Sequence, residues 1–263
     1  RKVFVANWGR TGTEVLDAET LELLPPLDLG TDVYRVNPGG VGQIVIEGFD
    51  QWIQVAVVDW RTGAVVRRFN GSQREGDSET SPDGRILYRA DNNISNAAIR
   101  SYSLVTGTGP IREGQPFPFG SRTLVLSGDG SRLFWQLAVF GPDLQTLGLL
   151  PERILASSRD GLVAFSQNAA FDVQELKGLA PLPAEATVMT VDGADSNLWY
   201  FHSPSASLRS VSLNSLKAPR IVTQPAEMTR TVRGGAVYIT ADTQGFAPLS
   251  YQWYRGEVPV PGA

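Results

Sequence analysis

The sequence predicts an all-β chain in which about six repeats of four short strands are followed by a smaller β domain. Three observations predict this organisation. A short turn pattern recurs six times at nearly constant spacing, a second turn precedes each of the last five copies, and no stretch of useful length shows helical periodicity. The 27 glycines and 17 prolines are scattered along the chain, as many tight turns require.

The recurring pattern consists of Asp or Ser, two variable residues, then Thr, Glu or Ser, then Gly or Leu. The first side chain can accept backbone N–H bonds at the entrance of a turn, and Gly supplies a positive φ at its exit. Successive copies start 42, 44, 40, 29 and 40 residues apart, and most of these steps match the ~40–45-residue period of a four-stranded propeller blade. The copies occupy residues 17–21, 59–63, 103–107, 143–147, 172–176 and 212–216.

The second turn, typically ending in Asp-Gly, is a strong hairpin signal between apolar runs. It occupies residues 37–40, 81–84, 127–130, 158–161 and 190–193. The two turns in constant order predict that each repeat reads strand, turn, strand, loop, strand, tight turn, strand. Four-stranded sheets repeated around an axis form a β-propeller. We expect the first repeat to be incomplete, because its second turn would fall before Arg1, and the fourth and fifth repeats to be short.

Three segments resemble the strand and turn signatures of the YVTN/WD40-like propeller family. They read VFVANWG at residues 3–9, VVDWRTGAVV at residues 57–66 and SPDGRILY at residues 81–88. The resemblance covers residues 1–218 and implies a β-propeller of about six visible four-stranded blades. It implies almost nothing about function.

Residues 219–263 resemble the opening strands of a bacterial immunoglobulin-like domain. They contain a strand expected at residues 236–241 and a second at 249–254. The resemblance places Trp253 at the tryptophan position of such domains, and Ala241 where their first cysteine stands. It implies a Cys-free variant in which a small residue packs on the indole. We expect only the N-terminal half of the β-sandwich here, with Trp253 or Tyr251 more exposed than in a complete domain.

Composition excludes several classes of function. The net charge is −4 and the arginines are dispersed, so we expect no nucleic-acid partner. There is no cysteine, which excludes disulfides and thiolate metal sites. No apolar run approaches the ~20 residues of a membrane helix, so we expect no membrane span.

The sequence contains few residues in patterns that suit catalysis or metal binding. His202 is the only histidine, and we interpret it as a strand-end residue rather than a general base or a metal ligand. Residues 91–93 and 192–197 offer oxygen ligands but lack the pattern of a calcium loop. We expect Trp8, Trp52, Trp60 and Trp135 to pack between repeats rather than to bind sugars or peptides. The sequence therefore predicts no catalytic, metal or cofactor site, and it assigns no ligand-binding residue.

These observations favour a non-enzymatic bacterial protein, extracellular or on the cell surface, that binds or scaffolds. Propeller loops would recognise a protein or a carbohydrate, and the immunoglobulin-like module would act as a spacer or an adhesive unit. This expectation rests on analogy of fold. The alternative is a propeller hydrolase or lyase with carboxylates at the central channel. Carboxylates that converge there with raised pKa values would favour the enzyme, and a dispersed polar ring would favour binding.

Overall fold

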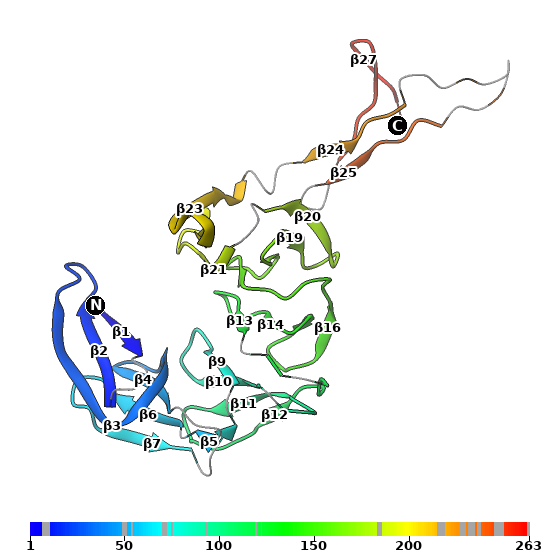
Figure 1. Ribbon diagram of the computed structural model, residues 1–263. Helices are drawn as coiled ribbons and strands as arrows, with labels where there is room; N and C mark the ends of the chain where they lie inside the picture. Colours follow the sequence, from blue (N-terminus) through cyan, green and yellow to red (C-terminus); the bar gives the residue numbers. More distant parts are fainter. Residues whose placement is uncertain are drawn as a thin grey trace.

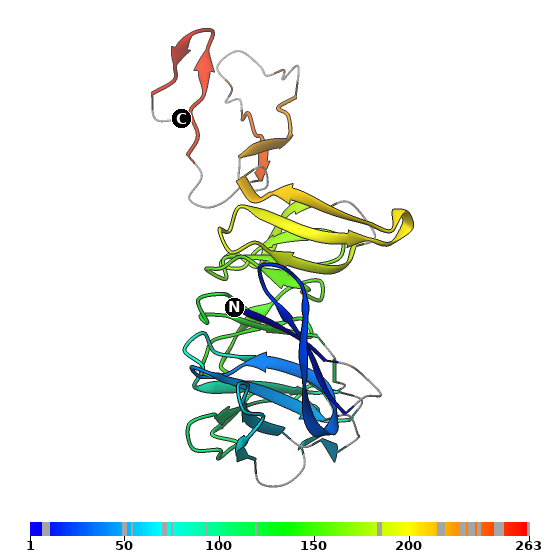
Figure 2. The same cartoon turned by 90° about the vertical axis from the view of Figure 1, so that its left-hand side faces the viewer.

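The computed structural model describes residues 1–6, 11–48, 52–53, 55–69, 73–74, 76–92, 94–118, 120–121, 123–182, 186–214, 219–226, 230, 235, 238–244 and 250–261. Its strands form antiparallel sheets that follow one another along an arc (Figure 1). Figure 2 shows the same sheets stacked in a side view, with the C-terminal segment leaving at one end. The predicted all-β chain with repeated four-stranded sheets is confirmed, and its arrangement is propeller-like.

We number six successive sheets along the arc, counting only described residues. Sheets 1 and 2 share the long strand β3 (Leu23–Pro38), which pairs with β2 as far as Asp32 and with β4 from Val33 onward. Sheet 1 contains β1 (Lys2–Ala6), β2 (Thr11–Asp17) and the first part of β3. Sheet 2 contains the last part of β3 with β4 (Gln43–Gly48), β6 (Val55–Asp59) and β7 (Val65–Arg68).

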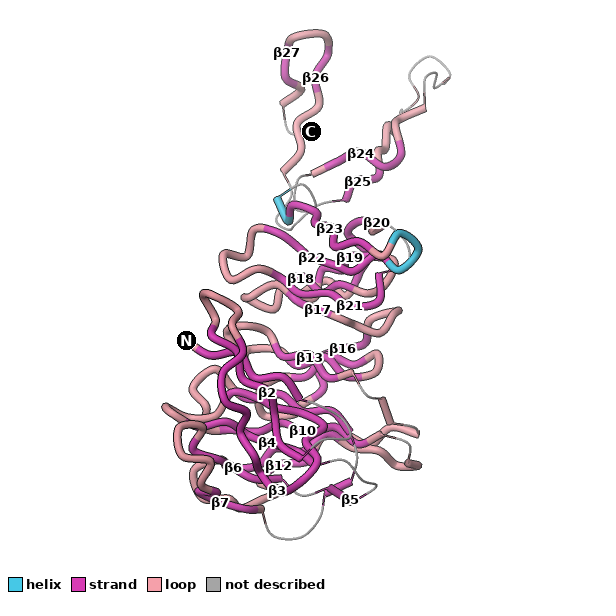
Figure 3. The backbone as a smooth tube through the Cα atoms, turned by 60° about the vertical axis from the view of Figure 1, so that its left-hand side comes forward, coloured by secondary structure: helices cyan, strands magenta, loops and turns pink. Residues whose placement is uncertain are grey.

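The next three sheets have four strands each, and the sixth has three among the described residues. Each runs antiparallel from its first strand to its last, with chain neighbours paired (Figure 3). Sheet 3 is β9 (Gly76–Thr80), β10 (Ile86–Asp91), β11 (Ile99–Ser103) and β12 (Arg112–Glu113). Sheet 4 is β13 (Leu124–Leu126), β14 (Leu133–Trp135), β15 (Ala138–Phe140) and β16 (Thr146–Leu149). Sheet 5 is β17 (Ala156–Ser157), β18 (Val163–Phe165), β19 (Ala169–Asp172) and β20 (Lys177–Pro181), and sheet 6 is β21 (Ala186–Val191), β22 (Asn197–His202) and β23 (Ser207–Ser212).

A small pair outside these sheets joins β5 (Trp52–Ile53) to β8 (Gln73–Arg74). The described residues also include one short 3-10 helix, η1 (Ser203–Ser205), between β22 and β23. No helix of the described chain has the length and apolar character needed to cross a membrane.

The core lies between the sheets rather than inside each of them. Middle strands such as β6 and β14 are buried along nearly their whole length because both faces of their sheets are covered. Among the described residues, five separate apolar clusters fill the five interfaces between neighbouring sheets. Representative pairs are Phe4 with Val58, Val57 with Leu87, Tyr88 with Leu133, Phe134 with Phe171, and Phe165 with Tyr200.

The predicted turns occur largely where the sequence places them. In residues 81–84, 127–130 and 158–161 the Ser hydroxyl donates to the Asp carboxylate and accepts the N–H of the residue five positions on, and Gly takes a positive φ. Residues 17–21, 59–63, 103–107 and 172–176 close with φ between 54° and 74° at their last residue. Each of these three Ser turns joins the first strand of a sheet to its second strand. Of the other four turns, the one at residues 17–21 joins β2 to β3 in sheet 1, and the remaining three join the third strand of a sheet to its outer strand. Repetition of the same local chemistry therefore accounts for the repeated sheets.

Three predicted turns are displaced. The turn expected at residues 37–40 runs from Gly39 to Gln43, with the positive φ at Gly42. The one expected at 143–147 closes instead between Gly141 and Leu144, whose N–H donates to the Gly141 carbonyl. In the turn expected at 190–193, Asp192 opens the loop and Asp195 takes the positive φ, because the Asp192 side chain bonds the N–H of Ser196. The last copy, at 212–216, ends outside the described residues.

Leu21 offers a test of the turn chemistry, because it holds a φ of 59° while its side chain is mostly exposed. A left-handed conformation is unfavourable for a residue with a Cβ atom and easy for Gly. We expect Leu21→Gly to raise the free energy of unfolding by about 0.5–1 kcal/mol. The matched control is Leu149→Gly in β16, also exposed but extended, which should lower it by a similar amount. Urea denaturation measures both, and a destabilised Leu21→Gly would contradict this interpretation.

The segment expected to be immunoglobulin-like contains two short strand pairs among its described residues. They are β24 (Arg220–Thr223) with β25 (Asp242–Gln244), and β26 (Tyr254–Arg255) with β27 (Val258–Pro259). The strand expected at residues 236–241 is misplaced, because the pairing with β24 begins at Asp242. Ala241 and Trp253 line one pocket of about 360 Å³, and Tyr251 is exposed, as expected.

Candidate functional site

A pocket of about 520 Å³ lies along the inner strands of sheets 2 to 6. Each sheet contributes the strand nearest the axis, namely β3, β9, β13, β17 and β21. These inner strands are neighbours in order, because β9 contacts β3 and β13, and β17 contacts β13 and β21. We call this cavity the central pocket. Its rim carries Arg159 and Asp192 from the turns of sheets 5 and 6.

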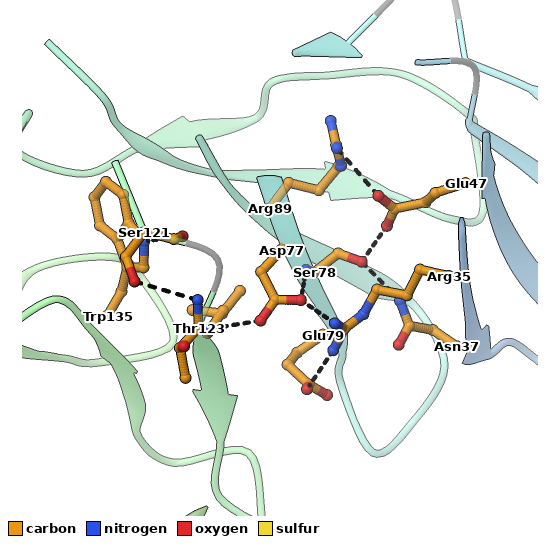
Figure 4. Close-up of polar contacts among 11 residues, drawn as sticks. Arg35, Asn37, Glu47, Asp77, Ser78, Glu79, Arg89, Ser121, Thr123 and Trp135 are labelled. Carbon is orange, nitrogen blue, oxygen red and sulfur yellow. Dashed lines mark hydrogen bonds and ion pairs between the residues drawn. The ribbon is translucent and has the colours of Figure 1, made fainter. Parts of the chain in front are cut away.

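Arg35 and Glu79 are the charged inner-strand side chains that line the central pocket. Arg35 projects from β3 and pairs with Glu79 on β9, with 3.1 Å between Nη2 and Oε1 (Figure 4). Arg35 also forms an ion pair with Asp77. Asp77 and Glu79 stand two residues apart on one strand, so the alternation of the strand places both on the same side.

Asp77 is a structural carboxylate. Its Oδ2 accepts the N–H of Leu124 at 2.6 Å and its Oδ1 accepts the N–H of Ser78 at 3.0 Å. Its side chain is only 6% exposed, whereas that of Glu79 is 32% exposed. Asp77 therefore ties β3, β9 and β13 together, and Glu79 is the carboxylate that faces the pocket.

A second buried network lies behind the first. Asn37 donates to the hydroxyl of Ser78 at 2.7 Å, and that hydroxyl donates to Glu47. Glu47 is fully buried and pairs with Arg89, with 3.1 Å between Oε2 and Nη2 (Figure 4). These contacts join sheets 2 and 3 and fix the strand that carries Asp77 and Glu79.

Burial raises the pKa values of the two carboxylates of the site, and Arg35 opposes this rise. Burial raises the pKa of Glu79 to about 7, with a further rise from Asp77 and a partial lowering by Arg35. Burial also raises the pKa of Asp77 against the effect of Arg35. Burial lowers the pKa of Arg35, but Asp77, Glu79 and Glu47 raise it more, so Arg35 stays charged. Glu79 can thus gain or lose a proton near neutral pH while Arg35 remains a fixed cation.

The residues that the sequence singled out lie mostly away from this pocket. His202 contacts the Ser205 hydroxyl at 2.7 Å at the exposed end of β22. Asp91 binds Arg100 at 2.7 Å and the N–H of Ala98, which explains it structurally. Asp192 does lie on the pocket rim. Within the described residues, no group of three or more His, Cys, Asp or Glu side chains could hold a metal ion.

Two of the four tryptophans pack between sheets, as expected. Trp135 is buried between sheets 3 and 4 and donates to the Ser121 carbonyl at 3.1 Å. Trp60 packs edge-on against Phe4, with 6.1 Å between ring centroids. Trp8 and the side chain of Trp52 lie outside the described part of the chain.

Arg35, Asp77 and Glu79 were missed by the sequence analysis. The signal that could have found them is the charged alternation of Asp77 and Glu79 just before the turn at residues 81–84. A first strand that leads into this turn is an inner strand, so charges at alternate positions there lie on one face of its sheet, where the inner strand of a neighbouring sheet can pair with them.

No known protein family matches the sequence, and neither does any curated protein. Among solved structures, 766 chains resemble the fold, so the fold alone does not single out a function. One of them is hydrazine synthase from Kuenenia stuttgartiensis, which has a TM-score of 0.66 and 12% sequence identity. The match covers 81% of this chain and 74% of that chain. At this identity, the likeness shows a shared fold and no family.

Proposed function

We propose that this chain is a non-enzymatic binding protein, extracellular or on the cell surface, whose central pocket takes a small carbohydrate. The observation that carries the proposal is the Arg35–Glu79 pair on the wall of a pocket of about 520 Å³. This volume lies in the usual range of small-molecule sites. A protein partner needs about 800 Å² of surface on each side, so the pocket favours the smaller of the two expected ligand classes.

The chemistry of the pair suits a ligand rich in hydroxyl groups. Arg35 offers donors in a planar fork, and Glu79 offers acceptors when it is ionised or a donor when it is protonated. Leu124 on β13 and Met189 and Val191 on β21 add apolar residues to the lining of the same pocket. A sugar presents both hydroxyl groups and apolar C–H faces, so it can use both kinds of surface.

In this proposal residues 1–218 form a β-propeller of about six blades, and residues 219–263 belong to an immunoglobulin-like domain that serves as a spacer or an adhesive unit. The five filled interfaces between sheets 1 to 6 support the first part. The shared pocket of Ala241 and Trp253 supports the second.

Glu79→Gln tests the binding proposal because it removes the charge while keeping the shape. A panel of neutral mono- and disaccharides would be screened by calorimetry against the wild type, and the variant tested on each sugar that binds. We expect at least a tenfold loss of affinity, about 1.4 kcal/mol. The control Glu175→Gln changes an exposed carboxylate and should bind as the wild type does. A panel without any binder, or a variant with unchanged affinity, would contradict the proposal.

A second candidate, a hydrolase or lyase, is favoured by one observation. Glu79 lines the pocket, Asp77 lies two residues before it on β9, and both have raised pKa values; a general acid or base works best with a pKa near the working pH. Against it, both oxygens of Asp77 already accept hydrogen bonds. Turnover of any bound sugar, lost by roughly a hundredfold or more in Glu79→Gln, would favour the enzyme over the binding protein.

A further inference from the structure

The inner strands of sheets 4, 5 and 6 each present a backbone edge to the central pocket. Among the described residues, β13, β17 and β21 each pair with a second strand on one side, and β13 and β21 lie on the inner side of the arc (Figure 1). At every second residue of such an edge, the backbone N–H and C=O groups point away from the paired strand. The register of each strand therefore decides which residues point these groups into the pocket.

In sheet 5 this residue is Ser157. The N–H of Ser158 donates to the Val163 carbonyl at 2.8 Å, within the sheet. Ser157 and Ala164 are the next pair of the ladder, so they form a non-hydrogen-bonded pair. The N–H and C=O groups of Ser157 consequently point away from β18, and Ser157 lines the central pocket.

Leu126 and Val191 are the equivalent residues of sheets 4 and 6. The residue after each of them donates its N–H to the second strand, at 2.9 Å in sheet 4 and 3.0 Å in sheet 6. Both also line the central pocket. Leu124, two residues before Leu126, confirms the orientation, because its N–H leaves the sheet and donates to Asp77. The same register thus brings three equivalent backbone positions to one pocket.

These backbone positions offer donors that are not used within the described part of the chain. No described contact occupies the N–H group of Leu126, Ser157 or Val191. The Val191 carbonyl receives one long contact, 3.5 Å from the Thr190 hydroxyl. All three residues are half-buried. A ligand that enters the pocket must replace the water at these groups with partners of its own.

The arrangement of the groups favours neighbouring hydroxyls over a peptide. The N–H and C=O of one extended residue point the same way, so one hydroxyl of a vicinal pair can accept from the N–H while the other donates to the C=O. A trans amide points its own N–H and C=O in opposite directions and cannot match both. An added β-strand needs outward groups at alternate residues along one strand. In β17 the alternation stops after Ser157, because the N–H of Leu155 already donates to Phe165.

We propose that the central pocket recognises its sugar through vicinal hydroxyl pairs, seated on the outward backbone N–H and C=O groups of Leu126, Ser157 and Val191. The inference rests on the proposed sugar-binding function and adds the chemical group that is recognised. Ser157 belongs to the middle strand of the three, so it is the position to test.

Deoxy sugars test which group of the ligand is recognised. The methyl glycosides of glucose, galactose and mannose are compared by calorimetry with their monodeoxy analogues. For each glycoside that binds, we expect removal of at least one hydroxyl to lower the affinity at least tenfold, because a backbone group then lies unpaired beside the ligand. A glycoside that binds as tightly as all of its deoxy analogues would overturn the inference.

Ser157→Pro tests which atoms of the protein recognise the sugar. Proline has no N–H, and the N–H of Ser157 bonds nothing in the sheet. We expect the affinity for the parent glycoside to fall at least tenfold. At least one of the deoxy penalties seen in the wild type should largely disappear, because the hydroxyl concerned has already lost its partner.

Two control variants separate the N–H from other effects of the substitution. Ser157→Ala removes the side-chain hydroxyl and keeps the backbone, so it should bind as the wild type does. Leu149→Pro places a proline on the outer strand β16, at a residue whose N–H also points away from its paired strand. It should bind as the wild type does.

Amide spectra of wild type labelled with nitrogen-15 give the answer even if Ser157→Pro does not fold. On saturation with a bound glycoside, the amide proton of Ser157 should shift to lower field, and that of Ser158, bonded within the sheet, much less. Sugar binding that leaves the Ser157 amide unshifted, or that Ser157→Pro leaves unchanged, would overturn this inference while the sugar-binding proposal stands. A set of sugars without any binder would overturn both.

Discussion

Arg89→Met should be among the most destabilising single substitutions in sheets 2 and 3. Arg89 and Glu47 form an ion pair in which the side chains are 6% and 1% exposed. Removal of Arg89 leaves the charge of Glu47 buried without its ion-pair partner, although the hydroxyl of Ser78 still donates to it. Breaking a buried pair in this way costs about 3–5 kcal/mol of unfolding free energy. Urea denaturation of the variant and the wild type measures the loss.

The double variant Glu47→Gln with Arg89→Met separates the charge from the packing. It removes both charges, so it should recover a large part of the stability that Arg89→Met loses. The control Lys177→Met breaks an exposed pair with Glu175 and should change stability by less than about 0.5 kcal/mol. An Arg89→Met variant within about 1 kcal/mol of the wild type would show that the buried network is not held by charge.

Glu79→Gln should be more stable than the wild type at pH 8 but not at pH 5. Burial raises the pKa of Glu79 to about 7 in the folded chain, above its ordinary value of 4.5. Between these values the folded state holds a proton that the unfolded state has released. The unfolding free energy of the wild type therefore falls as the pH rises from about 4.5 to 7. Glutamine does not titrate in this range, so the unfolding free energy of the variant should not fall in this way.

The size of this pH-dependent change in stability follows from the raised pKa of Glu79 and is reduced because the side chain is partly exposed. We expect the stability difference between variant and wild type to grow by about 2 kcal/mol from pH 5 to pH 8. The raised pKa of Asp77 acts in the same direction but is present in both proteins, so the subtraction largely removes it. Glu175→Gln should show no such growth. A constant difference across this range would mean that Glu79 titrates as an ordinary surface carboxylate.

The repeated sheets could be predicted because their signal is local. A Ser hydroxyl, an Asp carboxylate and a Gly within four residues close the turn at 81–84 by themselves, and the same set recurs at 127–130 and 158–161. Prediction failed where another residue could take the turn. Asp195 rather than Gly193 adopts the left-handed conformation because Asp192 holds the longer loop through Ser196.

The site could not be predicted because its residues meet only through the stacking of sheets. Arg35 and Glu79 are 44 residues apart and belong to different repeats. Their contact depends on the position of β3 in sheet 2 beside β9 in sheet 3. Glu47 gave a weaker hint, as a single charge after the apolar run Ile44, Val45 and Ile46. Such a charge demands a buried partner, but the sequence does not say that the partner is Arg89.

The central claim is that the inner strands hold a desolvated acid beside a fixed arginine. The most direct test is the titration of the Glu79 carboxyl carbon by NMR, in protein labelled with carbon-13 at glutamate and assigned with Glu79→Gln. The account predicts a midpoint near pH 7 for Glu79. A midpoint near 4.5 would show a solvated carboxylate and contradict the account.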